Sequence, residues 1–127
     1  MKISDILNED VTQSQLDSLE RVVDKAFAKL GIDVEFTRHF LDRVNDERNI
    51  KPITIQELAQ LFAKEYRKWG KPIAQLGPNS EAVMKDLASD INIPFVLKWN
   101  GNELEMIAKT VMRKKNFRTP NQEFPVQ

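Results

Sequence analysis

Apolar residues recur at the helical period in the first third of the chain. Between residues 12 and 30 they form one stripe, made up of Leu16, Leu19, Val22, Val23, Ala26, Phe27 and Leu30. This spacing predicts an amphipathic helix with one buried side. Thr12 and Gln15 can form a capping box at its start, and Gly31 suits the left-handed conformation that often follows a helix.

Two more helices are predicted before residue 70. Thr37 can cap a short helix that runs to about residue 47, whose inward side consists of Phe40, Leu41 and Val44. After Pro52, Thr54 and Glu57 can form another capping box, and Gly70 is expected to end the helix. The buried side of this third helix consists of Leu58, Leu61, Phe62 and Tyr66.

The apolar period changes from helical to alternating in the second half of the chain. "INIPFVLKW" alternates Ile91, Ile93, Phe95, Leu97 and Trp99, and the turn signal "NGN" separates it from "LEMIAKTVMRK". These features predict a β-hairpin. Pro94 indicates that the first strand lies at a sheet edge or begins near that residue, because proline cannot donate a ladder hydrogen bond.

Two segments of the second half are less definite. Residues 81–88 fit either a short helix capped by Ser80 or a third strand. Residues 119–127 contain two prolines and no period, so we expect an extended or mobile tail.

Helices followed by strands predict an α+β fold, with N-terminal helices packed on a C-terminal antiparallel sheet. A length of 127 residues, with 41% hydrophobic and 30% charged residues, indicates one soluble domain. We place this domain at residues 11–118, after a targeting-like or mobile segment at 1–10 and before the tail at 119–127. No apolar run approaches the roughly 20 residues of a membrane-spanning helix.

Composition restricts the chemistry. The chain has no cysteine and one histidine, which excludes disulfides, thiolate nucleophiles and zinc sites built from cysteine or several histidines. We therefore expect no metal and no cofactor. Nineteen basic residues balance nineteen acidic ones, but residues 106–118 contain no acid and five cations, which are Lys109, Arg113, Lys114, Lys115 and Arg118.

The histidine is a candidate catalytic residue. His39 and Arg43 are four positions apart on the predicted second helix, and Asp46 follows three positions later, so the three share a face. A histidine can move a proton while an arginine neutralises charge on a phosphate, which suits phosphate chemistry. The alternative is a solvated helix face, on which Arg38 pairs with Asp42 and Arg43 with Glu47.

The second strand of the hairpin is a candidate nucleic-acid surface. Lys109, Thr110, Arg113, Lys114 and Lys115 can form a track for a phosphate backbone, and Trp99 or Phe117 could stack a base. The alternative is that these cations protect a strand edge from aggregation.

Two stretches of the chain resemble a known group of families. "FTRHFLDRVNDERNIKPITIQEL" is similar to the opening of small nuclease-fold families grouped with BrnT, RelE, barnase and the colicin ribonuclease domains, and "IAKTVMRKKNF" resembles their closing strand. The resemblance covers roughly residues 34 to 117. It implies a RelE/barnase-like fold and a metal-independent ribonuclease. The catalytic residues it implies are His39, Arg43, Arg48, Thr110 and Arg113. The accompanying candidates for nucleic-acid binding are Arg38, Lys98, Lys109, Lys114, Lys115 and Arg118.

The N-terminus resembles another kind of segment. "MKISDILNE" is similar to capsid-targeting peptides of internal head proteins in T-even-like phages, and the whole chain resembles small proteins of T-even-like cyanophages. The resemblance implies cleavage after Glu9 by a prohead protease, packaging in the virion head and delivery to the host cytoplasm. The alternative is a short amphipathic helix through Ile3, Ile6 and Leu7 that packs on the domain.

Two functions therefore stay open. One is a packaged ribonuclease-type effector that cleaves RNA by acid/base chemistry, and the other is a non-catalytic nucleic-acid-binding or structural protein. The first requires His39 to lie near Thr110 or Arg113 across a concave surface. Neither function is expected to involve a membrane.

Overall fold

The computed structural model describes residues 10–49 and 51–127, which form helices on a β-sheet and confirm the α+β class. The helical elements are α2 (Gln13–Phe27), the 3-10 turn η1 (Ala28–Leu30), α3 (Arg38–Val44) and α4 (Ile55–Ala74). The strands are β1 (Ile32–Phe36), β2 (Glu81–Asp86), β3 (Ile91–Trp99), β4 (Leu104–Ala108), β5 (Met112–Arg113) and β6 (Gln122–Val126).

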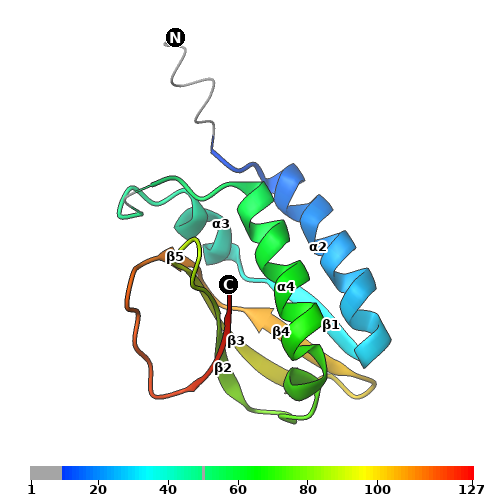
Figure 1. The fold of residues 1–127 in the computed structure, drawn as a ribbon. Helices are drawn as coiled ribbons and strands as arrows, with labels where there is room; N and C mark the ends of the chain where they lie inside the picture. The colour runs from blue at the N-terminus through cyan, green and yellow to red at the C-terminus, as the bar shows by residue number, and fades with distance from the viewer. Residues whose placement is uncertain (1–9, 50) are drawn as a thin grey trace.

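The sheet is mixed and not purely antiparallel, which corrects the expectation from sequence. Its strand order is β1-β4-β3-β2-β6, and β5 also pairs with β3. Strand β3 is antiparallel to β2, β4 and β5, whereas β1 is parallel to β4 and β6 is parallel to β2. Helices α2 and α4 lie side by side against one face, and α3 lies near β5 at one end of the sheet (Figure 1).

The first predicted helix is confirmed with its cap. The Thr12 hydroxyl oxygen accepts a hydrogen bond from the Gln15 amide at 3.1 Å, and the Gln15 side chain accepts one from the Thr12 amide at 3.0 Å. Gly31 follows η1 with a φ of 75°. Val22 was expected in the core but is 68% exposed, because the buried stripe is the narrower set Leu16, Leu19, Val23 and Phe27.

Helix α3 is shorter than predicted and lacks the predicted side-chain cap. It ends at Val44, since the Asn45 side chain accepts from the Val11 amide and donates to the Val11 carbonyl, both at 2.9 Å. The Thr37 hydroxyl makes no capping bond and instead donates to the Lys109 carbonyl at 2.8 Å. Thr37 therefore joins the start of α3 to the end of the hairpin.

Helix α4 begins at the predicted capping box, but it does not end at Gly70. Both bonds of the capping box between Thr54 and Glu57 are present, and the helix continues to Ala74. Gly70 is buried against η1: a Cβ at this position would lie 2.9 Å from Leu30 Cδ1. The glycine thus permits close packing and does not terminate the helix.

The predicted hairpin is confirmed as β3 and β4, but its second strand ends at Ala108 and does not continue through Lys109 to Lys114 as expected, since only Met112 and Arg113 form a further short strand, β5. The inference from Pro94 that β3 lies at a sheet edge is also wrong. Strand β3 is central in the sheet, and it begins at Ile91. On one side β3 pairs with β4 from Phe95 onward and with β5 at Ile91 and Asn92, so Pro94 lies opposite the break between them. Its missing N–H therefore interrupts no ladder, while its carbonyl accepts from the Lys109 amide at 2.9 Å.

The two less definite segments both form strands. Residues 81–86 are β2, not a helix, and residues 122–126 of the extended tail are β6, which pairs with β2. Phe124 and Val126 are buried, and Trp69 Nε1 donates to the Pro125 carbonyl at 2.8 Å. None of the described helices is long and apolar enough to cross a membrane.

Candidate nucleic-acid interface

A depression of about 1170 Å³ lies between α3 and the segment from Lys109 to Lys115. We call it the basic groove. Its lining residues are His39, Arg43, Asp46, Arg48, Asn49, Lys51, Asp90, Lys109, Thr110, Val111, Met112, Arg113, Lys114 and Lys115. All five of the residues predicted for catalysis line the basic groove, although they come from distant parts of the sequence.

Two hydrogen bonds donated by Thr37 bring the two sides of the basic groove together. Its hydroxyl donates to the Lys109 carbonyl at 2.8 Å across 72 positions of sequence, and its amide donates to the Ala108 carbonyl at 3.2 Å. Thr110 follows Lys109 directly in the chain, and His39 lies two positions after Thr37. The imidazole and the Thr110 hydroxyl are therefore carried by segments that are tied to each other.

The Arg113 side chain builds the wall of the basic groove and is not free in it. Its side chain is only 10% exposed. The guanidinium donates at 2.7 to 3.0 Å to the carbonyls of Lys51, Pro52 and Ser89 and to the Glu57 carboxylate. An arginine with these partners holds the segment before α4 against the sheet, and its geometry does not favour a direct phosphate contact.

Glu57 links the α4 cap to this wall. Its Oε1 accepts from the Thr54 amide at 3.1 Å and from Arg113 Nη2 at 2.7 Å. Burial alone would raise the pKa of Glu57, but the bonds from Arg113 and Thr54 outweigh it and hold the pKa below its usual value. The carboxylate therefore stays ionised and keeps Arg113 in place.

Asp46 organises two arginines at the rim of the basic groove. It accepts from Arg48 Nη2 at 2.7 Å and lies 3.4 Å from Arg43 Nη1. Arg43 thus pairs with Asp46, and the i,i+4 pair with Glu47 expected for a solvated helix is not formed. The Arg43 and Arg48 side chains are 46% and 75% exposed, so both cations remain accessible from solvent.

Three further lysines make the basic groove strongly cationic. Lys51, Lys114 and Lys115 are exposed, and none forms an ion pair with another described residue. Lys109 pairs with Glu81 at 3.1 Å, but the two side chains are about half exposed. Seven lysines and arginines line the basic groove, against two aspartates. A cationic concave surface attracts polyanions even on a chain of zero net charge.

A cluster of acids lies elsewhere, along β1 and β4. Carboxylate oxygens of Asp33, Glu35 and Glu105 lie within 4.8 Å of one another. Burial, a hydrogen bond with Asp24 and the neighbouring charges raise the pKa of Asp33 to about 7. None of these acids lines the basic groove. This acidic cluster is therefore separate from the cations of the basic groove.

Half of the six residues predicted for nucleic-acid binding line the basic groove, namely Lys109, Lys114 and Lys115. Arg38 is exposed on α3 but outside the groove lining, and Arg118 lines a second pocket. Lys98 and Trp99 lie at the end of β3 far from β5, so they do not take part in the groove.

Sequence reasoning missed Asn49 and Lys51. Asn49 is buried, accepts from the Arg113 amide at 2.9 Å and donates to the Arg43 carbonyl at 2.8 Å, so it joins the two walls of the basic groove. A single asparagine or lysine in a loop carries no periodic signal, and only the fold places these two residues beside Arg113.

Comparison of the chain with protein-family models, curated proteins and solved structures finds no match. The resemblance to RelE-like and barnase-like nucleases and the phage origin therefore stay predictions.

Proposed function

We propose that the basic groove binds the phosphodiester backbone of RNA and that His39 transfers a proton during metal-independent cleavage. The observation that carries this proposal is the shared lining of one depression by His39 and the segment Lys109–Lys115. If the histidine and the basic segment had unrelated roles, nothing would require them to line the same depression.

The contacts and exposure of the lining residues support a division of roles among them. Lys51, Lys114 and Lys115 supply unpaired charge for the RNA backbone. Arg43 and Arg48 are held near the basic groove by Asp46 and stabilise charge that develops on the phosphate. Arg113 acts indirectly, because its guanidinium is occupied by the wall contacts.

The reaction that fits these groups is attack of a ribose 2'-hydroxyl on the adjacent phosphorus, with departure of the 5'-oxygen. His39 accepts the proton of the attacking hydroxyl, and the departing oxygen takes a proton from solvent. His39 is exposed, and its side chain forms no hydrogen bond with another described residue, so the imidazole is available to a bound strand.

The test is cleavage of single-stranded RNA in the presence of a chelator. The wild-type protein is expected to cleave, and His39→Ala is expected to lose the activity while keeping its circular dichroism spectrum. Arg38→Ala is the matched control, since Arg38 is exposed on the same helix but does not line the basic groove. Intact RNA after incubation with the wild type, or equal cleavage by His39→Ala, contradicts the catalytic proposal.

A second candidate function is binding without cleavage. Two observations favour it: the wall contacts occupy Arg113, and no described residue orients the His39 imidazole by a hydrogen bond. A protein of this kind is expected to bind RNA with a steep dependence on salt concentration and to leave the RNA intact.

We extend the proposal to packaging in a phage head, followed by action in the host cytoplasm. The proposed cleavage signal, Leu7 to Glu9, lies outside the described residues. Cleavage after Glu9 would leave Val11 and its hydrogen bonds to Asn45 in the product. Incubation with a prohead protease tests this: a product that begins at Asp10 supports packaging, and an uncut chain contradicts it.

A further inference from the structure

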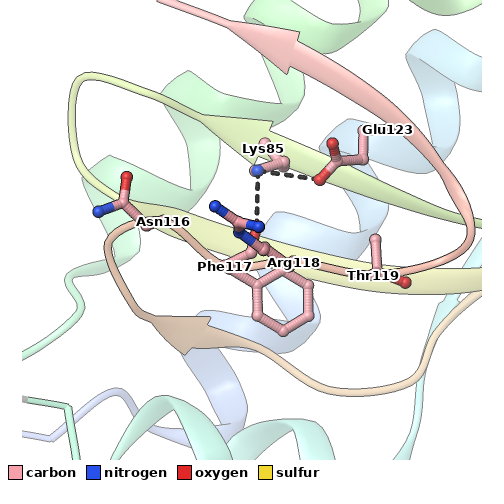
Figure 2. A pocket seen from close by; sticks show the side chains of 6 residues that line it. All are labelled: Lys85, Asn116, Phe117, Arg118, Thr119 and Glu123. Atoms are coloured by element: carbon pink, nitrogen blue, oxygen red, sulfur yellow. Dashed lines mark hydrogen bonds and ion pairs between the residues drawn. The ribbon is translucent and has the colours of Figure 1, made fainter.

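A second pocket, of about 380 Å³, adjoins the loop that bounds the basic groove. We call it the Phe117 pocket, and its lining residues are Lys85, Asn116, Phe117, Arg118, Thr119 and Glu123 (Figure 2). Lys114 and Lys115 line the basic groove, and the next four residues of the same loop line the Phe117 pocket. One short loop therefore borders both depressions.

The loop is held to the sheet at two points. Lys85 Nζ donates to the Phe117 carbonyl at 2.8 Å and to Glu123 Oε2 at 2.9 Å (Figure 2). Asn92 Nδ2 donates to the Lys114 carbonyl at 3.0 Å. Lys85 and Asn92 are direct partners in the β2–β3 register, so one cross-strand pair supports both parts of the loop. The pocket is thus preformed, which reduces the ordering cost of binding.

No packing contact in the core explains the position of the Phe117 ring. The residue is half-buried, but it belongs neither to the hydrophobic core nor to the side chains packed against that core, and it forms no aromatic pair with another described ring. An accessible aromatic ring beside a cationic groove is a suitable stacking platform for a planar ligand.

Polar groups around the ring match the edge of a nucleobase. Arg118 is exposed and forms no ion pair with the described residues, and Asn116 is exposed as well. Their N–H groups, with the Thr119 hydroxyl, can donate to base carbonyl and ring nitrogen atoms. Lys85 and Glu123 form an ion pair with each other, so neither needs a charged ligand to neutralise it.

We propose that the Phe117 pocket binds one unpaired nucleobase of a strand whose backbone occupies the basic groove. The base stacks on Phe117, and its edge accepts hydrogen bonds from Arg118 and Asn116. This inference rests on the proposed function of the basic groove as a backbone-binding site. It specifies the substrate class as single-stranded RNA, because a base held in a duplex cannot enter the pocket.

The experiment compares two labelled oligonucleotides of equal length and charge by fluorescence anisotropy. One is a 2'-O-methyl oligouridylate, which cannot be cleaved by its own 2'-oxygen, and the other is an abasic oligomer. Wild-type protein is expected to bind the base-containing oligomer on the order of 10-fold more tightly, the scale of one stacked base. Phe117→Ala is expected to remove this preference without changing the affinity for the abasic oligomer.

Two variants provide controls. Phe117→Tyr keeps an aromatic ring and is expected to keep the preference. Lys114→Ala lies in the basic groove and is expected to weaken both oligomers equally. Equal wild-type affinity for the two oligomers, or an unchanged preference in Phe117→Ala, overturns the base pocket while the groove proposal stands. If neither oligomer binds the wild type, both proposals fail.

Discussion

The carboxyl group of Glu65 leads to a strong prediction about stability. Glu65 lies on α4 and is fully buried, and neither of its carboxylate oxygens has a hydrogen-bond partner among the described residues. Burial raises the pKa of Glu65 to about 9, the charge of Asp86 raises it further, and the charges of Lys68 and Lys64 offset only part of this increase. The folded protein therefore holds this side chain protonated at neutral pH.

The energetic cost follows from linkage between protonation and folding. In the unfolded chain the carboxyl titrates at its ordinary value of 4.5, so at pH 7 it is ionised there and must take up a proton on folding. The free energy of unfolding decreases by about 1.36 kcal/mol for each pH unit above 4.5, so at pH 7 it is lower by about 3 kcal/mol. The cost is absent below pH 4.5 and grows until the pH reaches about 9.

The perturbation that isolates this cost is Glu65→Gln, which keeps the shape of the side chain and removes its titration. At pH 7 the variant is expected to be more stable than the wild type by about 3 kcal/mol. The advantage should nearly vanish at pH 4.5 and increase towards pH 9. Glu47→Gln is the matched control, because Glu47 is exposed and takes part in no ion pair with a described residue.

Urea unfolding of the three proteins at a series of pH values measures the difference. All other titrating groups are shared, so the pH dependence of the gap between wild type and Glu65→Gln reports Glu65 alone. A gap that stays constant between pH 5 and 8.5 refutes the raised pKa. A less stable Glu65→Gln at neutral pH shows instead that the carboxylate is ionised and has favourable partners in the folded protein.

Two further predictions concern the basic groove. Arg113→Ala should lower the free energy of unfolding by roughly 2 to 4 kcal/mol, since it leaves Glu57 and three carbonyls without their partner. Arg113→Lys should recover only part of this, and a thermal midpoint equal to wild type in Arg113→Ala would contradict the structural role. Because the pKa of Glu57 is held low, its ionised carboxylate stabilises the fold above pH 4.5, and this stabilisation is lost as the pH falls below 4.5. Arg113→Ala removes the partner that keeps the pKa low, so its free energy of unfolding should decrease less on acidification than that of the wild type. The double variant Lys114→Ala/Lys115→Ala should reduce the steepness of log affinity for single-stranded RNA against log salt by about 1.4, and an unchanged slope would show that neither lysine contacts phosphate.

The sequence by itself determined the elements whose signals are local. The capping boxes at Thr12 and Thr54, the apolar stripe of α2 and the turn between β3 and β4 each depend on residues a few positions apart. Such patterns specify conformation because the interacting groups are neighbours along the chain. The same locality made the basic segment after residue 106 and the lone histidine visible as candidates.

Tertiary structure alone decided how these elements combine. The parallel pairing of β1 with β4 and of β6 with β2 depends on partners distant in sequence, so neither strand could be placed by its own pattern. Gly70 continues a helix because Leu30 packs against it, and Pro94 sits in a central strand because the facing ladder is broken there.

The site shows the same division. His39, Arg43 and Arg113 were candidates because of their residue types. Only the fold showed that they line one depression and that the Arg113 guanidinium is bound within its wall. Burial of Glu65 on an otherwise amphipathic helix was likewise invisible to the pattern, since a carboxyl group is expected on the solvated side. Packing between distant segments decides which polar groups contact each other and which become buried away from solvent.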